Sequence, residues 1–170
     1  AGRPARRQTL MRLALLLAAL PLALLVAAQL GALAGRMPAD LGVTEGRLKP
    51  PSATRNSVSS QADLHPDHPQ RAYARIDPLP FKPGGAQASM QALAQALALL
   101  PGARVVRAEG GYLYAQARTP WLKFTDDLEF WANPDKGAID LRSASRLGRE
   151  DFGANRQRIE ALRALYLAQP

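Results

Sequence analysis

Asp126 is the residue whose place in the sequence is most suggestive of a chemical role. From Leu122 to Ala132 apolar and polar residues alternate, as in a strand with one buried face, and the alternation places Asp126 on the apolar face. A buried carboxylate needs hydrogen-bond partners or takes up a proton. Two interpretations are open, a hydrogen-bonded structural residue or an ionisable group of a site. Asp127 must face the opposite way, so the two carboxylates cannot act as an acid–base pair at one site.

A second candidate site combines aromatic rings with arginines on the other face of the expected sheet. The set comprises Tyr112, Tyr114, Trp131, Arg142 and Arg146. These residue types are enriched where binding energy concentrates. The face therefore suits a membrane-protein partner or an amphiphilic ligand. The alternative is that residues 50–83 cover this face and that nearby carboxylates pair with the arginines.

Arginines also surround the expected beginning of the last helix. Arg146, Arg149 and Arg156 lie near its free N–H groups, an arrangement that suits a phosphate or a lipid headgroup. Asp151 is well placed to cap this helix and would repel an anion. An anion site is therefore an alternative to the aromatic face.

Metal binding and catalysis have little support in the sequence. His65 and His68 have Asp63 and Asp67 beside them, but the intervening prolines prevent a helix that would align the imidazoles, and a solvated turn is the simpler interpretation. The serines near these histidines lack the context of a catalytic triad. The absence of cysteine excludes disulfides, thiol catalysis and cysteine-ligated zinc. We expect no catalytic residue, no metal and no cofactor.

The elements that position these residues begin with a hairpin. The strand that contains Asp126 leads through a turn rich in Asn, Pro, Asp and Gly to a second strand over 138–145. The turn length places Phe130 opposite Leu141 and Glu129 opposite Arg142. The expected core face comprises Leu122, Phe124, Leu128, Phe130, Ala132, Ile139 and Leu141.

Two further strands and two helices complete the expected domain. Residues 103–108 and 112–118 form a hairpin across two glycines, and 71–76 is a short strand. The core face of the hairpin is expected to comprise Val106, Ala108, Leu113, Ala115 and Ala117. Residues 86–100 and a segment that follows Asp151 have helical periodicity, the latter through Phe152, Asn155, Ile159, Leu162 and Tyr166. This order predicts an α+β fold, with an antiparallel sheet of about five strands and two helices on one face.

The N-terminal part divides into three segments. A basic segment, 1–12, precedes an apolar run over 13–34 that is long enough to cross a bilayer. This run is either a transmembrane anchor or a secretory signal with a cleavage site before Gly35. Residues 35–70 form a Pro-rich extended linker, and 71–170 form the globular domain.

The charge gives no support for nucleic-acid binding. The net charge is +8, but four basic residues precede the apolar run and all the acidic residues follow it. The excess beyond the apolar run is therefore small, and no basic stripe with interleaved aromatics is present.

Several short motifs resemble a known family, domain of unknown function 1499. They are Asn56-Ser57-Val58-Ser59-Ser60-Gln61, Asp126-Asp127-Leu128-Glu129-Phe130, Arg142-Ser143-Ala144-Ser145-Arg146, Gly148, Asp151-Phe152-Gly153, Asn155-Arg156 and Arg158-Ile159-Glu160. The resemblance covers about Leu48 to Leu165 and implies a small protein that is membrane-anchored or exported, with no known activity. Ser57 stands where the family commonly has cysteine, so a role that needs a thiol is absent.

These observations favour a binding or scaffolding domain over an enzyme. The expected location is the cytoplasmic membrane, with the N-terminus in the cytoplasm and the domain in the periplasm. The expected partners are the bilayer, through Leu13–Ala34, and a membrane protein or an amphiphilic ligand. The alternative function is binding of an amphiphilic ligand or a lipid headgroup, and a hydrolase is less favoured. The candidate binding residues are Tyr112, Tyr114, Trp131, Arg142, Arg146, Arg156 and Asp126.

Overall fold

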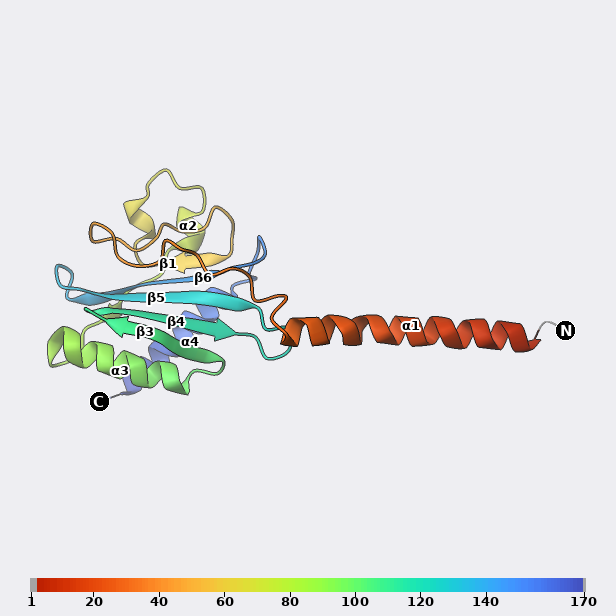
Figure 1. Ribbon diagram of the computed structural model, residues 1–170. Coiled ribbons are helices and arrows are strands. Elements are labelled where there is room, and N and C mark those ends of the chain that lie inside the picture. The colour runs from red at the N-terminus through yellow and green to blue at the C-terminus, as the bar shows by residue number, and fades with distance from the viewer. Residues whose placement is uncertain (1–2, 170) are drawn as a thin grey trace.

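An antiparallel sheet forms the centre of the computed structural model, which describes residues 3–169 (Figure 1). Within that range six strands pair in the order β1-β6-β5-β4-β3, with β2 beside β6. Their bounds are β1 Ser57–Ser59, β2 Leu79–Pro80, β3 Ala103–Glu109, β4 Tyr112–Arg118, β5 Thr125–Asn133 and β6 Ala138–Ser145. The predicted α+β class and antiparallel sheet are confirmed. The first two residues of the predicted basic segment lie outside the described residues.

The register of the β5–β6 hairpin is the predicted one. Phe130 pairs with Leu141 and Glu129 pairs with Arg142. Leu128, Phe130, Ile139 and Leu141 are all buried in the core. Phe124 differs from the prediction, because β5 begins only at Thr125 and the Phe124 side chain is 37% exposed. The alternation in the sequence therefore extended beyond the strand into the loop that precedes it.

The β3–β4 hairpin forms across the two glycines, but its core face is shorter than predicted. Leu113, Ala115 and Ala117 are buried, whereas Val106 is 44% exposed and Ala108 is also exposed. A register shift between Val105 and Arg107 leaves Val106 as the extra residue of a bulge, so Val105 and not Val106 stands opposite the buried Ala115. β3 is also the edge of the sheet, so little chain is available to cover it.

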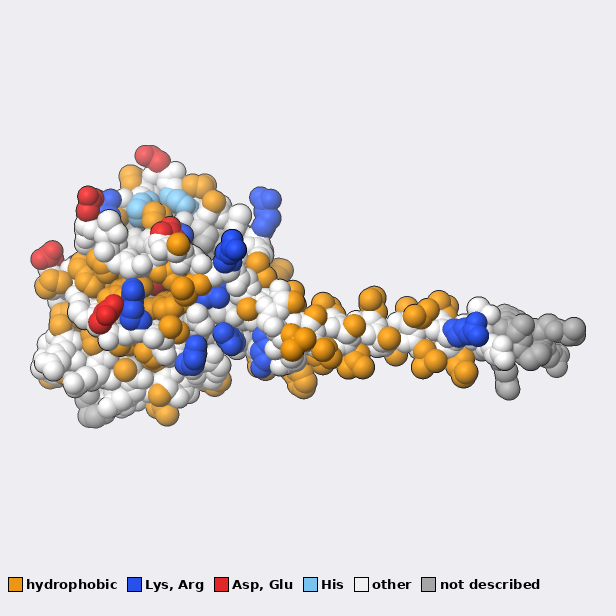
Figure 2. Space-filling view, in the orientation of Figure 1, with side chains coloured by type: hydrophobic (Ala, Val, Ile, Leu, Met, Phe, Trp, Pro, Cys, Tyr) orange, Lys and Arg blue, Asp and Glu red, His pale blue; other side chains and the backbone are white. Residues whose placement is uncertain are grey.

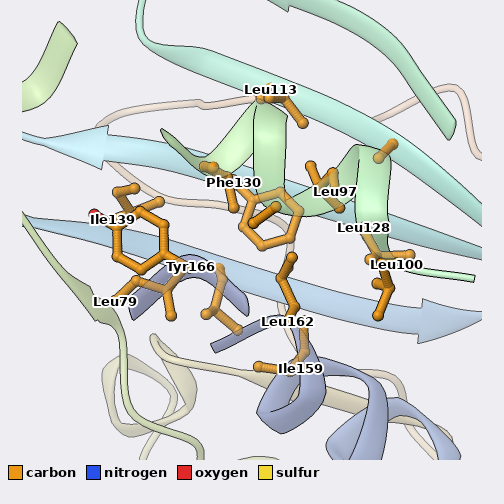
Figure 3. Packing of buried hydrophobic residues seen from close by; sticks show 14 of the residues in the cluster. Leu79, Leu97, Leu100, Leu113, Leu128, Phe130, Ile139, Ile159, Leu162 and Tyr166 are labelled. Atoms are coloured by element: carbon orange, nitrogen blue, oxygen red, sulfur yellow. The ribbon is translucent and has the colours of Figure 1, made fainter. Parts of the chain in front are cut away.

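Two helices, α3 (Gly85–Leu99) and α4 (Ala154–Ala168), lie on one side of the sheet, as predicted (Figure 1). Their apolar residues pack against Leu113, Leu128 and Phe130 to form the main core (Figure 3). The residues that the helices contribute include Leu93, Leu97, Ile159, Leu162 and Tyr166. Full burial of one such side chain contributes roughly 1.5–3 kcal/mol. This apolar layer therefore holds one face of the sheet against the two helices. The predicted helical stripe is correct except for Phe152, which precedes α4 and is 87% exposed.

The apolar N-terminal run forms the helix α1 (Arg3–Gln29), which extends away from the domain (Figure 1). It ends five residues before the predicted Ala34, and residues 30–34 form turns and a bend. Gln8–Gln29 is long and apolar enough to cross a membrane, and a signal sequence would have the same character. Pro21 lies inside the helix.

The segment predicted as an extended linker, 35–70, is part of the folded domain. It contributes β1, which pairs with β6, and the short 3₁₀ helix η1 (Ala62–Leu64). Residues 71–76, predicted as a strand, instead begin with the helical turn α2 (Arg71–Ala74). The sheet thus includes residues on both sides of the predicted boundary at residue 71.

Candidate functional site

The aromatic face predicted to bind a partner is covered by the chain itself. Residues 36–50, which we call the covering segment, lie on the side of the sheet opposite to α3 and α4 (Figure 1). Leu48 of this segment packs against Tyr112 and Tyr114, which are only 7% and 4% exposed. The covering residues therefore lie just before the 50–83 range that the sequence suggested. Trp131 is partly buried in the same cluster.

The two tyrosines bind carboxylates of β5. The hydroxyl of Tyr112 donates to Glu129 Oε1 at 2.9 Å, and that of Tyr114 donates to Asp127 Oδ1 at 2.6 Å. Burial, together with the neighbouring carboxylate, raises the pKa of each tyrosine, so both hydroxyls keep their protons. Glu129 Oε1 also accepts from the backbone N–H of Gly42 at 2.8 Å. This carboxylate therefore ties the covering segment to the sheet.

The same carboxylates hold Arg142 of β6 and Arg146, the residue that follows this strand. Arg142 Nη1 lies 3.4 Å from Glu129 Oε2, and its Nε donates to the carbonyl of Pro50 at 3.1 Å. Arg146 donates to both oxygens of Asp127, at 2.7 Å and 2.9 Å. Burial lowers the pKa of Arg142, whereas the hydrogen bond with Asp127 raises the pKa of Arg146. Both guanidinium groups remain cationic, since arginine does not lose its proton in proteins.

A basic pocket of about 310 Å³ lies between the covering segment and β6. Its lining residues are Arg36, Pro38, Lys49, Pro51, Ser52, Ala53, Asp127, Arg142, Ala144, Ser145 and Arg146. Lys49 forms an ion pair with Asp40 at 2.6 Å, but that carboxylate is largely exposed. Within residues 3–169, Arg36 has no ion pair and no side-chain hydrogen bond. The pocket thus combines two immobilised cations with two that are available to a ligand.

The basic pocket lies beside the end of α1. Gly35 packs so closely on the chain just after β6 that an added Cβ would stand 2.7 Å from the Cβ of Arg146. The side chain of Gln29, the last residue of α1, donates to the carbonyl of Trp121 at 2.7 Å. Figure 2 shows lysine and arginine side chains gathered near α1, whereas the acidic side chains lie farther from it. The positive charge of this face is therefore concentrated where the helix joins the domain.

Asp126 lies on the core face of the sheet, as predicted, and away from the basic pocket. Its Oδ2 accepts from Arg158 Nη2 of α4 at 2.5 Å. Arg158 also donates to Asn155 Oδ1 at 2.9 Å. The structure therefore supplies the partner that a buried carboxylate needs. Asp126 and Arg158 both border a separate cavity of about 300 Å³.

The remaining predicted residue, Arg156, is also separate from the pocket. It donates to the backbone carbonyls of Tyr73 and Arg75, and so holds the α2 region against α4. The anion site predicted at the beginning of α4 is occupied by a carboxylate. Asp151 accepts from the backbone N–H groups of Gly153 and Asn155 at 2.9 Å and 3.1 Å. Of the predicted arginines, only Arg142 and Arg146 therefore share one cavity.

Sequence reasoning missed Arg36 and Lys49, because it treated their segment as a linker. It also missed a buried cluster around Asp140, which accepts from Ser60, Gln61, Asn133 and Lys136. The signal for this cluster was present, since Ser60 and Gln61 belong to one of the motifs quoted above.

The histidines do not assemble with other ligands. Among the described residues, no group of three or more His, Cys, Asp or Glu side chains is placed to hold a metal ion. The Nδ1 atom of His68 accepts from the backbone N–H of Gln70 at 3.1 Å, which is turn geometry. Burial lowers the pKa of His65, so this imidazole is neutral near pH 7.

The sequence was compared with known proteins. Residues 47–165 match a family described as "Protein of unknown function (DUF1499)". The match begins within the covering segment and ends near the end of α4, so it includes Lys49, Arg142 and Arg146 but not Arg36. No curated protein matches the sequence.

Proposed function

The chain belongs to the DUF1499 family, and we propose that it is a non-catalytic binding domain, tethered to a membrane by α1, that binds the phosphate of an anionic lipid headgroup. The observation that carries the proposal is the basic pocket beside the end of α1, lined by Arg36, Lys49, Arg142 and Arg146. A pocket of about 310 Å³ is at the small end of the range for small-molecule sites, which suits a headgroup.

The pocket has the chemistry of a phosphate site. Guanidinium groups present planar sets of N–H donors that match phosphate oxygens. Asp127 and Glu129 fix the orientation of Arg146 and Arg142 before any ligand arrives, so little entropy is lost on binding. Arg36 has no competing partner, and the partner of Lys49 is exposed. A bound phosphate therefore gains two new charge-assisted contacts without breaking a buried one.

The tether supports a lipid as the source of the phosphate. A helix that crosses the bilayer at Gln8–Gln29 would hold the pocket at the depth of the headgroups. Arginines precede the apolar run, and the positive-inside rule then places the N-terminus in the cytoplasm and the domain on the periplasmic side. Both the membrane and this orientation are parts of the proposal.

The buried state of the aromatic face favours this function over partner docking. A partner that used Tyr112, Tyr114 and Trp131 would first have to displace the covering segment, which Glu129 holds through Gly42 and Arg142. Such displacement would expose Leu48 and two tyrosines to water. The lipid-headgroup alternative requires no such rearrangement.

A titration of the full chain in micelles of a neutral detergent tests the headgroup site. Short-chain phosphatidylglycerol, short-chain phosphatidylcholine, glycerol phosphate and inorganic phosphate are added separately, and affinity is measured calorimetrically. We expect phosphatidylglycerol to bind more tightly than phosphatidylcholine. The double substitution Arg36→Gln with Lys49→Gln should weaken it about fivefold, since exposed charge pairs contribute roughly 0.2–1 kcal/mol each.

Arg71→Gln serves as a control, because it removes a positive charge from α2, outside the pocket. It should bind phosphatidylglycerol as the wild type does. Equal affinity of the wild type for the two lipids, or an unchanged affinity of the double variant, would refute the headgroup site. Inorganic phosphate that binds as tightly as phosphatidylglycerol would assign the pocket to a free phosphate instead.

A further inference from the structure

Four large apolar side chains are exposed on the loops that flank the end of α1. The β4–β5 loop carries Trp121 and Phe124, which are 73% and 37% exposed. The β6–α4 loop carries Leu147 and Phe152, which are 42% and 87% exposed. We call these four residues the apolar rim. Phe124, Leu147 and Phe152 border one cavity, so the two loops form a continuous surface. Exposed apolar patches of this kind mark interaction sites.

Phe152 shows that this exposure is imposed by the backbone. Its φ angle is +51°, in the left-handed region that bulky residues rarely adopt. The backbone before and after Phe152 is held in place, because the Asp151 carboxylate accepts from the N–H groups of Gly153 and Asn155. The local fold thus holds a phenyl ring out in solvent at a cost in conformational energy. The ring is 87% exposed, so packing within the described part of the chain contributes little against that cost.

The apolar rim is continuous with α1. Gln29 binds the carbonyl of Trp121 at 2.7 Å, and Gly35 packs against the Leu147 side chain. The same two loops carry Lys123 and Arg149, whose side chains have no ion-pair partner in the part of the chain that the structure describes. Aromatic rings flanked by free cations are the composition of segments that lie at a bilayer surface.

We propose that the apolar rim inserts into the headgroup boundary of the bilayer that α1 crosses. The domain then rests on the membrane through two loops instead of extending from the helix into solvent. The inference rests on the membrane tether of the proposed function but not on the basic pocket. Insertion is favourable because it removes the apolar side chains of Trp121 and Phe152 from water. The charged ends of Lys123 and Arg149 remain at the level of the lipid phosphates.

Tryptophan quenching in nanodiscs tests the insertion directly. The full chain with Trp131→Phe leaves Trp121 as its tryptophan. It is reconstituted in phosphatidylcholine with or without bromine on the acyl chains near the headgroup. A ring buried about 5–10 Å into the interface should lose at least about half of its fluorescence to the brominated lipid. Neutral lipid is used, so the readout does not depend on anion binding.

Two further variants, both in a Trp121→Phe, Trp131→Phe background, give the comparison. Phe152→Trp reports on the second loop and should be quenched like Trp121. Asp135→Trp places the ring at the exposed β5–β6 turn, at the end of the sheet opposite to α1 (Figure 1), and should keep its fluorescence. Circular dichroism verifies that each variant is folded.

Quenching of both rim positions but not of the distal control supports the proposal. Equal, weak quenching at all three positions overturns it. This is also the result expected if a second copy of the chain shields the rim from the lipid. If the chain does not co-elute with nanodiscs, the tether and the rim proposal both fall. If the headgroup titration fails while rim quenching persists, only the basic pocket is refuted.

Discussion

Nη2 of Arg158 on α4 lies 2.5 Å from Oδ2 of Asp126 on β5, and this ion pair joins the last helix to the core face of the sheet. The two side chains are only 16% and 8% exposed. Arg158 also donates to Asn155 Oδ1, and the Asn155 side chain donates to the carbonyl of Asn56, the residue just before β1. A polar connection therefore runs through the apolar layer from β5 to β1. It explains why a carboxylate is tolerated where the alternation requires an apolar residue.

Removal of one partner of this pair should destabilise the domain strongly. Arg158→Met leaves the Asp126 carboxylate buried without its cation, which costs about 3 kcal/mol. Asp126→Asn combined with Arg158→Met should cost less than Arg158→Met alone, because no charge is then left unpaired. Urea unfolding of the full chain in detergent, followed by tryptophan fluorescence, measures the differences. A double variant that loses as much stability as Arg158→Met alone, or more, would contradict the coupling.

Glu129→Ala should release the covering segment. The carboxylate binds Tyr112, Gly42 and Arg142, so its loss removes the link between that segment and β5 and leaves Arg142 unpaired in the interior. Hydrogen exchange at residues 41–50 should become at least about tenfold faster, which corresponds to roughly 1.4 kcal/mol. Glu109→Ala, which removes an exposed carboxylate from β3, is the control and should leave this exchange unchanged.

The four long strands, β3 to β6, were predictable because each carries its own local signal, whereas the short strands β1 and β2 were missed. The alternation around Leu128 and Ile139 fixes both faces of the β5–β6 hairpin, and the turn length fixes the register, so two independent cues agree. The same reasoning failed at Val106. A bulge depends on how an edge strand relaxes against its neighbour, and alternation in the sequence carries no sign of it.

The basic pocket was only half predictable. Arg142 lies on a recognised strand, and its pairing with Glu129 follows from the register, whereas Arg146 lies one residue beyond β6 and pairs with Asp127, which is opposite Ala144. Lys49 lies in a Pro-rich stretch with no periodicity, and its position depends on long-range packing of Leu48 on the tyrosines. The prediction of a linker rested on composition alone. Prolines disfavour helices, but they do not indicate which part of the fold an extended chain packs against.

Gly102→Ala should destabilise the β3–β4 hairpin far more than Gly137→Ala. Both glycines have positive φ, +75° and +60°, so each substitution carries a backbone cost of about 1 kcal/mol. At Gly102 the new Cβ would also stand 2.5 Å from the carbonyl oxygen of Arg118, whereas at Gly137 it meets open space. Thermal unfolding should show a larger drop in Tm for Gly102→Ala. Equal losses would mean that the contact with Arg118 relaxes without cost.

Asp140 should make the domain sensitive to acid. Burial raises the pKa of this carboxyl, but hydrogen bonds from Asn133, Ser60, Lys136 and Gln61 outweigh the burial and hold the pKa below its ordinary value of 3.8. A depressed pKa means that the folded state binds the proton less readily than the unfolded state does. The stabilisation is therefore complete above pH 3.8 and is lost as the pH falls from there through the lower folded value.

Asp140→Asn tests this assignment, since it removes the titration but retains a side chain that can hydrogen-bond. Its free energy of unfolding should be lower than that of the wild type at pH 7 and should fall less steeply below about pH 4. Asp135→Asn, at the exposed turn next to this cluster, is the matched control and should reproduce the acid limb of the wild type. Parallel acid limbs for Asp140→Asn and the wild type would show that other carboxylates govern the loss. Urea unfolding at a series of pH values provides the measurement.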